Sequence, residues 1–362
     1  MPGKFSLRYF SDIDLNDPFF DSLKNDYQGS VKTSEFTTWF NNKALEGRTA
    51  LVFNDDEGLG AFIAIKPEAE RIELDELIMP AIQRLKICTF LISPRYRGQR
   101  LGEGALGLIL WKWQQFGYKE VYVTVFKSHK DLITQLEKFG FRLIGHRDGE
   151  CVYVKSRDAI DYSDPYKSFP FITPNFDEAG YLVVNDYFHD TLFPYSELKR
   201  NSTPKVILDV SNGLSKTYIG APTSKLGFNA GDPVFVYRKH TGSGSKGYNS
   251  CVTTYCMVKD IVQVKERGKV LLTYAEYLSR IGNKSVYEPL ELENQYNNNS
   301  NLVLIELVYY GFFGGGKNIN WVWLKNNDCW GDTYPTSVKL SHEQFNKILK
   351  AGNLDVSNVI ID

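Results

Sequence analysis

Strand-like and helix-like segments alternate between residues 85 and 144, and this alternation limits the possible folds more than any other feature of the chain. Residues 85–92 and 120–126 are apolar or β-branched and read as strands, whereas 102–116 and 131–139 have helical patterns. Two strands of one sheet that are joined through a helix run parallel, with a crossover connection. The sequence therefore predicts an α/β layer structure.

The flanking residues extend this pattern. Residues 4–10 alternate like a strand, and 14–27 and 34–46 look helical, with Asp14 as the N-cap of the first. Strand pairs are expected at 49–53 with 59–65 and at 141–144 with 151–154; an acidic stretch, 68–76, precedes the central strand. We place this α/β domain at residues 1–157.

The remaining 205 residues differ in character. Residues 158–200 are rich in proline and aromatic residues, which predicts an ordered connector rather than a flexible linker. Residues 201–362 predict a small, mainly β barrel with a last helix that starts at Ser341 and has Gln344 in a capping box. The strands expected there are 205–210, 233–237, 252–264, 302–312 and 321–324.

Composition excludes several classes of protein. The 362 residues are 43% hydrophobic and 23% charged, which is typical of globular domains and not of disordered chains or fibres. The net charge of −1 argues against a polycation built for nucleic acid. No apolar run approaches the ~20 residues of a membrane span. Five cysteines without a CxxC pair predict free thiols in a cytoplasmic protein, with no metal site.

A basic, glycine-bearing loop joins the central strand to the next helix. Arg95, Arg97 and Arg100 lie in it, and Gly102 and Gly104 follow at the helix start. Glycines allow close approach, and the first backbone N–H groups of a helix attract anions, so the loop predicts a phosphate cradle. The alternative is that the glycines only permit tight packing while the arginines are solvated.

Two nucleotide-binding motifs do not fit. Residues 102–107 match GxGxxG, but eight residues separate the strand end from Gly102, and the next strand ends in Lys127 rather than an acid. The GGGK of residues 314–317 lacks the spacer and the Ser or Thr of a P-loop.

The loop resembles that of the GCN5-related N-acetyltransferases (GNAT family). Residues 99–104, QRLGEG, match the family's Q/R-x-x-G-x-G/A motif, and 137–141, EKFGF, resemble its EKLGF segment. The resemblance implies a GNAT fold and acetyl-CoA as co-substrate, with the pantetheine along a splayed central strand and the pyrophosphate on the loop. The residues so implied are Phe90, Leu91, Ile92, Arg97, Gly98, Gln99, Arg100, Leu101, Gly102, Glu103 and Gly104.

The catalytic groups are less clear from the resemblance. The family's usual tyrosine acid falls at Leu136, which has no proton to donate, and its usual asparagine falls at His129. Glu73, Asp75 and Glu76 precede the central strand and are base candidates, of which we choose Glu76 together with His129. The alternatives are a solvated acidic loop and a surface or helix-cap histidine.

Residues 229–237 and 252–264 resemble the core of PUA-like domains, the ASCH and EVE relatives, which implies an RNA or ribonucleoprotein partner. Rings beside cations suit bases and phosphates. The alternative is that the tryptophans are core and the cations are solvated. The candidates are Lys216, Lys225, Arg238, Lys239, His240, Lys246, Trp321, Trp323 and Trp330.

The sequence thus predicts an acetyl-CoA-dependent N-acetyltransferase whose acceptor is an RNA-borne or RNA-associated amine. Two alternatives stay open. One is a non-catalytic acetyl-CoA-binding regulatory or RNA-binding protein, which Leu136 favours. The other is an N-acetyltransferase for protein or small-molecule amines.

Overall fold

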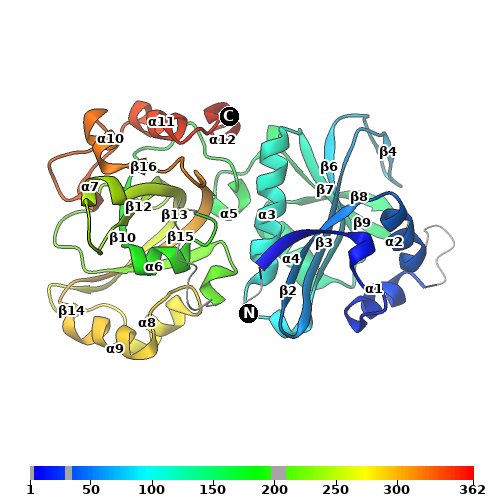
Figure 1. Cartoon of the computed structure of the whole chain (residues 1–362), viewed down its shortest axis with the longest axis horizontal. Coiled ribbons are helices and arrows are strands. Elements are labelled where there is room, and N and C mark those ends of the chain that lie inside the picture. The colour runs from blue at the N-terminus through cyan, green and yellow to red at the C-terminus, as the bar shows by residue number, and fades with distance from the viewer. Residues whose placement is uncertain (1–3, 29–34, 197–208) are drawn as a thin grey trace. The chain divides into compact units, whose positions relative to one another are not determined.

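The computed structural model describes residues 4–28, 35–196 and 209–362 (Figure 1). The chain divides into two compact units, residues 1–105 with 116–159 (unit 1) and residues 106–115 with 160–362 (unit 2). The division passes through helix α3 (Leu101–Phe116), whose first turn belongs to unit 1. Each unit has its own seven-stranded sheet.

The sheet of unit 1 confirms the predicted α/β architecture. Its order is β1-β2-β3-β6-β7-β9-β8, and the neighbouring strands β6 and β7 are parallel whereas the other pairs are antiparallel. Helix α3 makes the crossover between β6 and β7. The strands are β1 (Lys4–Tyr9), β2 (Thr49–Asp55), β3 (Gly58–Glu68), β6 (Arg84–Ile92), β7 (Glu120–Val125), β8 (Arg142–Arg147) and β9 (Glu150–Ser156).

The helices of unit 1 correct one detail of the sequence prediction. The expected helix over 14–27 is a 3₁₀ turn followed by α1, and Asp17 rather than Asp14 is the cap, because Pro18 fits the first helical position and the Asp17 carboxylate accepts the Phe19 N–H at 2.9 Å. The elements are η1 (Phe10–Asp12), η2 (Pro18–Phe20), α1 (Asp21–Asp26), α2 (Phe36–Leu45), η3 (Pro94–Tyr96), α4 (Lys130–Lys138) and η4 (Arg157–Ala159).

Both faces of this sheet are covered. Aromatic residues of the first helices, including Phe20 and Phe40, pack on one face around Phe62. Leu101 at the start of α3 packs with Ala61 on the other face, since neighbouring strand residues point to opposite sides. A short hairpin that the sequence did not predict, β4 (Ile72–Glu73) with β5 (Ile78–Met79), begins within the acidic stretch and ends just after it, before β6.

The second sheet is ordered β10-β12-β13-β15-β11, with β14 and β16 also paired to β13. Only the β10–β12 pair is parallel. This confirms a mainly β second unit, whereas its PUA-like identity stays a prediction. The strands are β10 (Gly180–Asn185), β11 (Ser215–Gly220), β12 (Pro233–Lys239), β13 (Cys251–Glu266), β14 (Lys269–Val270), β15 (Leu302–Phe312) and β16 (Ile319–Asn320).

One strand predicted in unit 2 is wrong. Residues 321–324 lie in helix α10, where the Asn320 side chain accepts the Trp323 N–H and caps the first turn. The last helix has the expected capping box between Ser341 and Gln344. The helices are α5 (Pro165–Ser168), α6 (Asp186–Leu192), η5 (Asp209–Ser211), α7 (Lys246–Asn249), α8 (Tyr274–Ile281), α9 (Pro289–Asn298), α10 (Trp321–Asn326), η6 (Pro335–Ser337), α11 (His342–Ala351) and α12 (Val356–Val359).

Two predictions about this region stay open. Most of the strand expected at 205–210 lies outside the described residues. The expected boundaries at 157 and 200 stay predictions, although strand β10, which comes from residues 158–200, pairs with β12 in the second sheet. No helix in the described parts of the chain has the length and apolar character needed to cross a membrane.

Candidate functional site

The two parallel strands of unit 1 separate along their length. Their pairing runs from Arg84↔Glu120 to Ile87↔Val123 and ends there, although β6 continues to Ile92. Cys88 is an extra residue in the β3–β6 register at this point, which makes a β-bulge. A bulge bends its strand, so β6 diverges from β7 over its last residues. This is the splay that the resemblance implied at Phe90, Leu91 and Ile92, which are all half-buried.

The loop after β6 turns sharply into α3. Gly98 and Arg100 have positive φ angles, 77° and 58°, a conformation that is uncommon for a residue such as arginine. Helix α3 starts at Leu101, and the Gly104 N–H bonds the Arg100 carbonyl. The first turn of a helix directs backbone N–H groups away from its own carbonyls, so the N–H groups of Leu101 and Gly102 lie where an anion is favoured.

The side chains of this loop divide into two groups. Arg95, which we expected to add charge to the phosphate cradle, bonds the Asp55 carboxylate at 2.6 Å and the Gly58 carbonyl at 3.0 Å and so holds the β2–β3 turn. The buried carboxylate of Glu103 pairs with Lys138 at 3.1 Å, which ties α3 to α4. Arg97, in contrast, is exposed and makes no ion pair with the described residues.

The EKFGF segment ends helix α4. Gly140 has a φ of 79°, and its N–H and that of Phe141 close the helix on Glu137 and Leu136. Leu136 is 1% exposed, so the position of the family's usual tyrosine is a core position here. No proton donor replaces it at this residue.

Glu150 is a buried carboxylate that the sequence did not single out. It begins β9, and its carboxylate accepts the Tyr27 hydroxyl at 3.1 Å and the Thr124 hydroxyl. Thr124 lies on the part of β7 beyond the last pairing with β6, so the Glu150 carboxylate contacts β7 near the end where that strand separates from β6. Burial raises the pKa of Glu150 above its usual value, with the two hydroxyl bonds opposing the shift.

The two catalytic residues predicted from the sequence make structural contacts. Glu76 accepts the His146 backbone N–H at 2.7 Å and contacts the His146 Nδ1 at 2.5 Å, and these bonds lower the pKa of Glu76. The His129 Nε2 lies 3.1 Å from the Asp26 carboxylate, and the His129 side chain is 41% exposed. Glu73 is exposed beside Arg71.

Some of the basic residues that the sequence predicted to contact RNA make hydrogen bonds or ion pairs inside unit 2. Lys216 is 1% exposed and donates to the Val210 carbonyl. Arg238 binds both carboxylate oxygens of Asp190, and His240 contacts Asp186. These groups are therefore not arranged as an exposed basic face. Among the described residues, no three His, Cys, Asp or Glu side chains lie close enough together to hold a metal ion.

Residues 16–141 match the model of the acetyltransferase (GNAT) family. This match supports an N-acetyltransferase domain in general over these residues, most of which belong to unit 1. A search of curated proteins found no match.

Three solved structures illustrate the weaker likenesses. A ZmASCH mutant protein from Zymomonas mobilis is 12% identical, covering 48% of this chain and 94% of its own, with a TM-score of 0.32. A GNAT-family acetyltransferase from Listeria monocytogenes is 15% identical (42% and 94%, TM-score 0.31). Arabidopsis thaliana NAA60 in complex with a bisubstrate analogue is 15% identical (42% and 98%, TM-score 0.31). The TM-scores of these three structures are all low.

Proposed function

We propose that unit 1 is an acetyl-CoA-dependent N-acetyltransferase that acts on a primary amine. The observation that carries the proposal is the divergence of β6 from β7 beside a glycine loop that opens helix α3, within residues that match the family model. A gap between two parallel strands exposes backbone groups that would otherwise pair, and a helix start provides N–H groups for an anion.

The residues present fit acetyl-CoA. The backbone N–H groups of Leu101 and Gly102, with the exposed Arg97, would take the pyrophosphate charge. The splayed residues 90–92 would take the amide-bearing pantetheine chain in place of a strand partner. A Cβ added at Gly102 would meet the Ile92 Cγ1 at 3.8 Å, an ordinary contact, so space alone does not require glycine there.

We propose Glu150 as the general base in place of Glu76. A base must accept a proton from the acceptor's ammonium group so that the neutral amine can attack the thioester, and a carboxylate with a raised pKa does so more effectively than one with a lowered pKa. Burial raises the pKa of Glu150, whereas the bonds from His146 lower that of Glu76. Glu150 also lies beside the splayed end of β7, and its hydroxyl partners Tyr27 and Thr124 fix its orientation.

The acceptor is proposed only as an amine. An RNA-borne amine remains a prediction of the sequence, and two of the cations on which it depends, Lys216 and Arg238, are used inside unit 2. The missing tyrosine acid at Leu136 does not prevent transfer, since a thiol with a pKa of about 8.5 is a tolerable leaving group.

The test is release of CoA thiol from acetyl-CoA by the full chain. The acceptors are peptides with a free N-terminus, a polyamine, a lysine-containing peptide with a blocked N-terminus, and an aminoacyl-RNA. We expect release that depends on one of these amines and a product that is heavier by one acetyl group. Tight binding of acetyl-CoA without release in the presence of any amine would instead support the non-catalytic alternative.

A further inference from the structure

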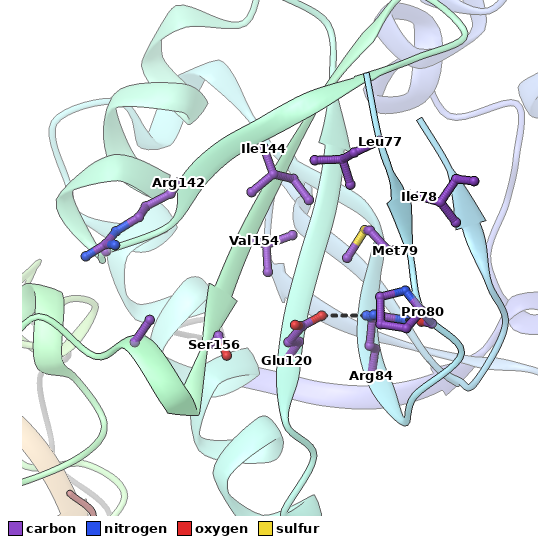
Figure 2. A pocket seen from close by; sticks show the side chains of 12 residues that line it. Leu77, Ile78, Met79, Pro80, Arg84, Glu120, Arg142, Ile144, Val154 and Ser156 are labelled. Carbon is purple, nitrogen blue, oxygen red and sulfur yellow. Dashed lines mark hydrogen bonds and ion pairs between the residues drawn. The ribbon is translucent and has the colours of Figure 1, made fainter. Parts of the chain in front are cut away.

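A cavity of about 330 Å³ lies in unit 1 at the start of strands β6 and β7. It is separate from the splayed end of β6, because Arg84 and Ile92 are eight positions apart, roughly 26 Å of extended strand. Figure 2 shows Met79, Ile144 and Val154 gathered in this space, with Arg84 joined to Glu120 at one end of the group and Arg142 on the far side.

Arg84 is the unusual member of this lining. It is fully buried, at 0% exposure, and its Nε donates to Glu120 at 2.6 Å while Nη1 donates to the Pro80 carbonyl at 2.7 Å. Its Nη2 is buried without a hydrogen-bond partner in the described structure. A buried guanidinium donor that is left unpaired is costly, and Arg84 is one of the residues that line this end of the cavity, so an acceptor that reached Nη2 there would remove that cost.

The charge of the lining indicates which acceptor fits. The guanidinium of Arg84 is balanced by the Glu120 carboxylate. Arg142, whose exposed side chain Figure 2 shows directed away from Met79 and Val154, adds a second positive charge at the edge of the lining, without an ion pair among the described residues. The lining is therefore cationic overall, which favours a carboxylate over a neutral carbonyl. The other walls are apolar, from Leu77, Ile78, Met79, Ile144 and Val154.

We propose that this cavity binds a small molecule that carries one carboxylate on an apolar body. The carboxylate accepts hydrogen bonds from the Nη2 of Arg84, and the apolar body packs on Met79, Ile144 and Val154. The volume equals that of about ten water molecules, so the ligand has on the order of ten non-hydrogen atoms. This site does not rest on the proposed acetyltransferase activity, because none of its lining residues belongs to the splay or to the loop before α3.

The test is an NMR titration of the full chain with labelled methionine, isoleucine, leucine and valine methyl groups. The probes are octanoate, 3-phenylpropionate and indole-3-acetate, each beside its neutral amide. We expect at least one acid to give saturable shifts at Met79, Ile144 and Val154, and its amide to bind at least tenfold more weakly.

Three variants complete the test. Ile144→Phe fills the cavity and abolishes binding, whereas Leu143→Phe, at an exposed neighbour outside the lining, retains it. Arg84→Lys keeps a positive charge beside Glu120 but loses the planar guanidinium. We expect this variant to bind the acid at least tenfold more weakly, and thermal unfolding checks that it is folded. The proposal is overturned if no acid saturates, if acid and amide bind alike, or if the Ile144→Phe variant binds as the wild type does.

Discussion

The two ends of strand β6 are built in opposite ways. At Arg84 the strand is paired on both sides, with Glu68 of β3 and Glu120 of β7, and a buried ion pair reinforces the pairing. At Ile92 the strand has lost its β7 partner and leads into a loop with two residues of positive φ. The first end gains stability from side-chain bonds, and the second leaves backbone groups to bind something else.

The two ends of β6 therefore suit different kinds of ligand. Open backbone beside a helix start suits a phosphate-bearing chain, which is long and makes many main-chain contacts. A closed sheet surface with one unpaired guanidinium donor suits a compact anion that supplies a single acceptor group. The two ends are therefore expected to respond differently to substitution.

The largest effect is expected at the closed end. Arg84→Met leaves Glu120 half-buried and unpaired, so the free energy of unfolding should fall by about 3–5 kcal/mol in urea titrations. The double variant Arg84→Met/Glu120→Leu removes both charges and should recover most of that loss. A single variant as stable as the wild type would contradict the structural role of this pair.

A somewhat smaller effect is expected at the open end, and there on binding rather than stability. Gly102→Asp places a negative charge at the start of α3, where a pyrophosphate would lie, and should weaken acetyl-CoA binding at least about 100-fold in calorimetry. Gly102→Ala is the matched control, because its Cβ makes only the 3.8 Å contact with Ile92. Equal affinities of the two variants would place the pyrophosphate elsewhere.

Glu150→Gln should separate catalysis from stability. We expect kcat to fall about 100-fold. In the wild type, kcat/KM should rise with pH as Glu150 ionises, above the usual carboxylate range, and the variant should lack this rise. The control is Glu137→Gln. Glu137 lies on α4, and its carboxylate also accepts a tyrosine hydroxyl, that of Tyr153 at 3.1 Å. A similar loss in both variants would argue against a base at Glu150.

The same shift gives a signed stability prediction. Because the pKa of Glu150 is raised in the folded state, its stabilising contribution is present below the unfolded pKa and is lost as pH rises through the raised value. Glu150→Gln should therefore show a smaller decrease in unfolding free energy than the wild type over that pH range. An opposite trend, with the variant losing more stability as pH rises, would mean that the Glu150 carboxylate is stabilised by its hydroxyl partners.

The smallest expected effect tests the independence of the two ends. Ile144→Phe fills the cavity, and we expect it to change the dissociation constant of acetyl-CoA by less than about twofold, since sites this far apart without shared partners are usually additive. Calorimetry of the wild type and the variant checks this. A tenfold change would show that the two ends are coupled.

The structural elements that depend on neighbouring residues in the chain could be predicted from the sequence. The strand, loop and helix over residues 85–116 follow from local apolar patterns and glycines, and the EKFGF segment ends a helix as expected. Residues 321–324 were misassigned as a strand, because tryptophan and valine favour strands, whereas the Asn320 cap starts a helix there.

Long-range contacts explain what the sequence did not show. Glu150 and Tyr27 are 123 positions apart, and only the packing of α1 near the end of β7 brings them together. The unpaired Nη2 of Arg84 likewise results from the geometry of β6, β7 and the β4–β5 hairpin. No residue pattern along the chain marks either group.

The open end of β6 is proposed to bind acetyl-CoA, and the closed end is not. The most direct measurement is an NMR titration of the wild-type chain with acetyl-CoA that follows the amides of Leu101 and Gly102 and the methyl groups of Met79 and Ile144. We expect saturable shifts of the two amides at micromolar acetyl-CoA and no shift of the two methyl groups. Saturation at the cavity methyl groups with unmoved loop amides would contradict it.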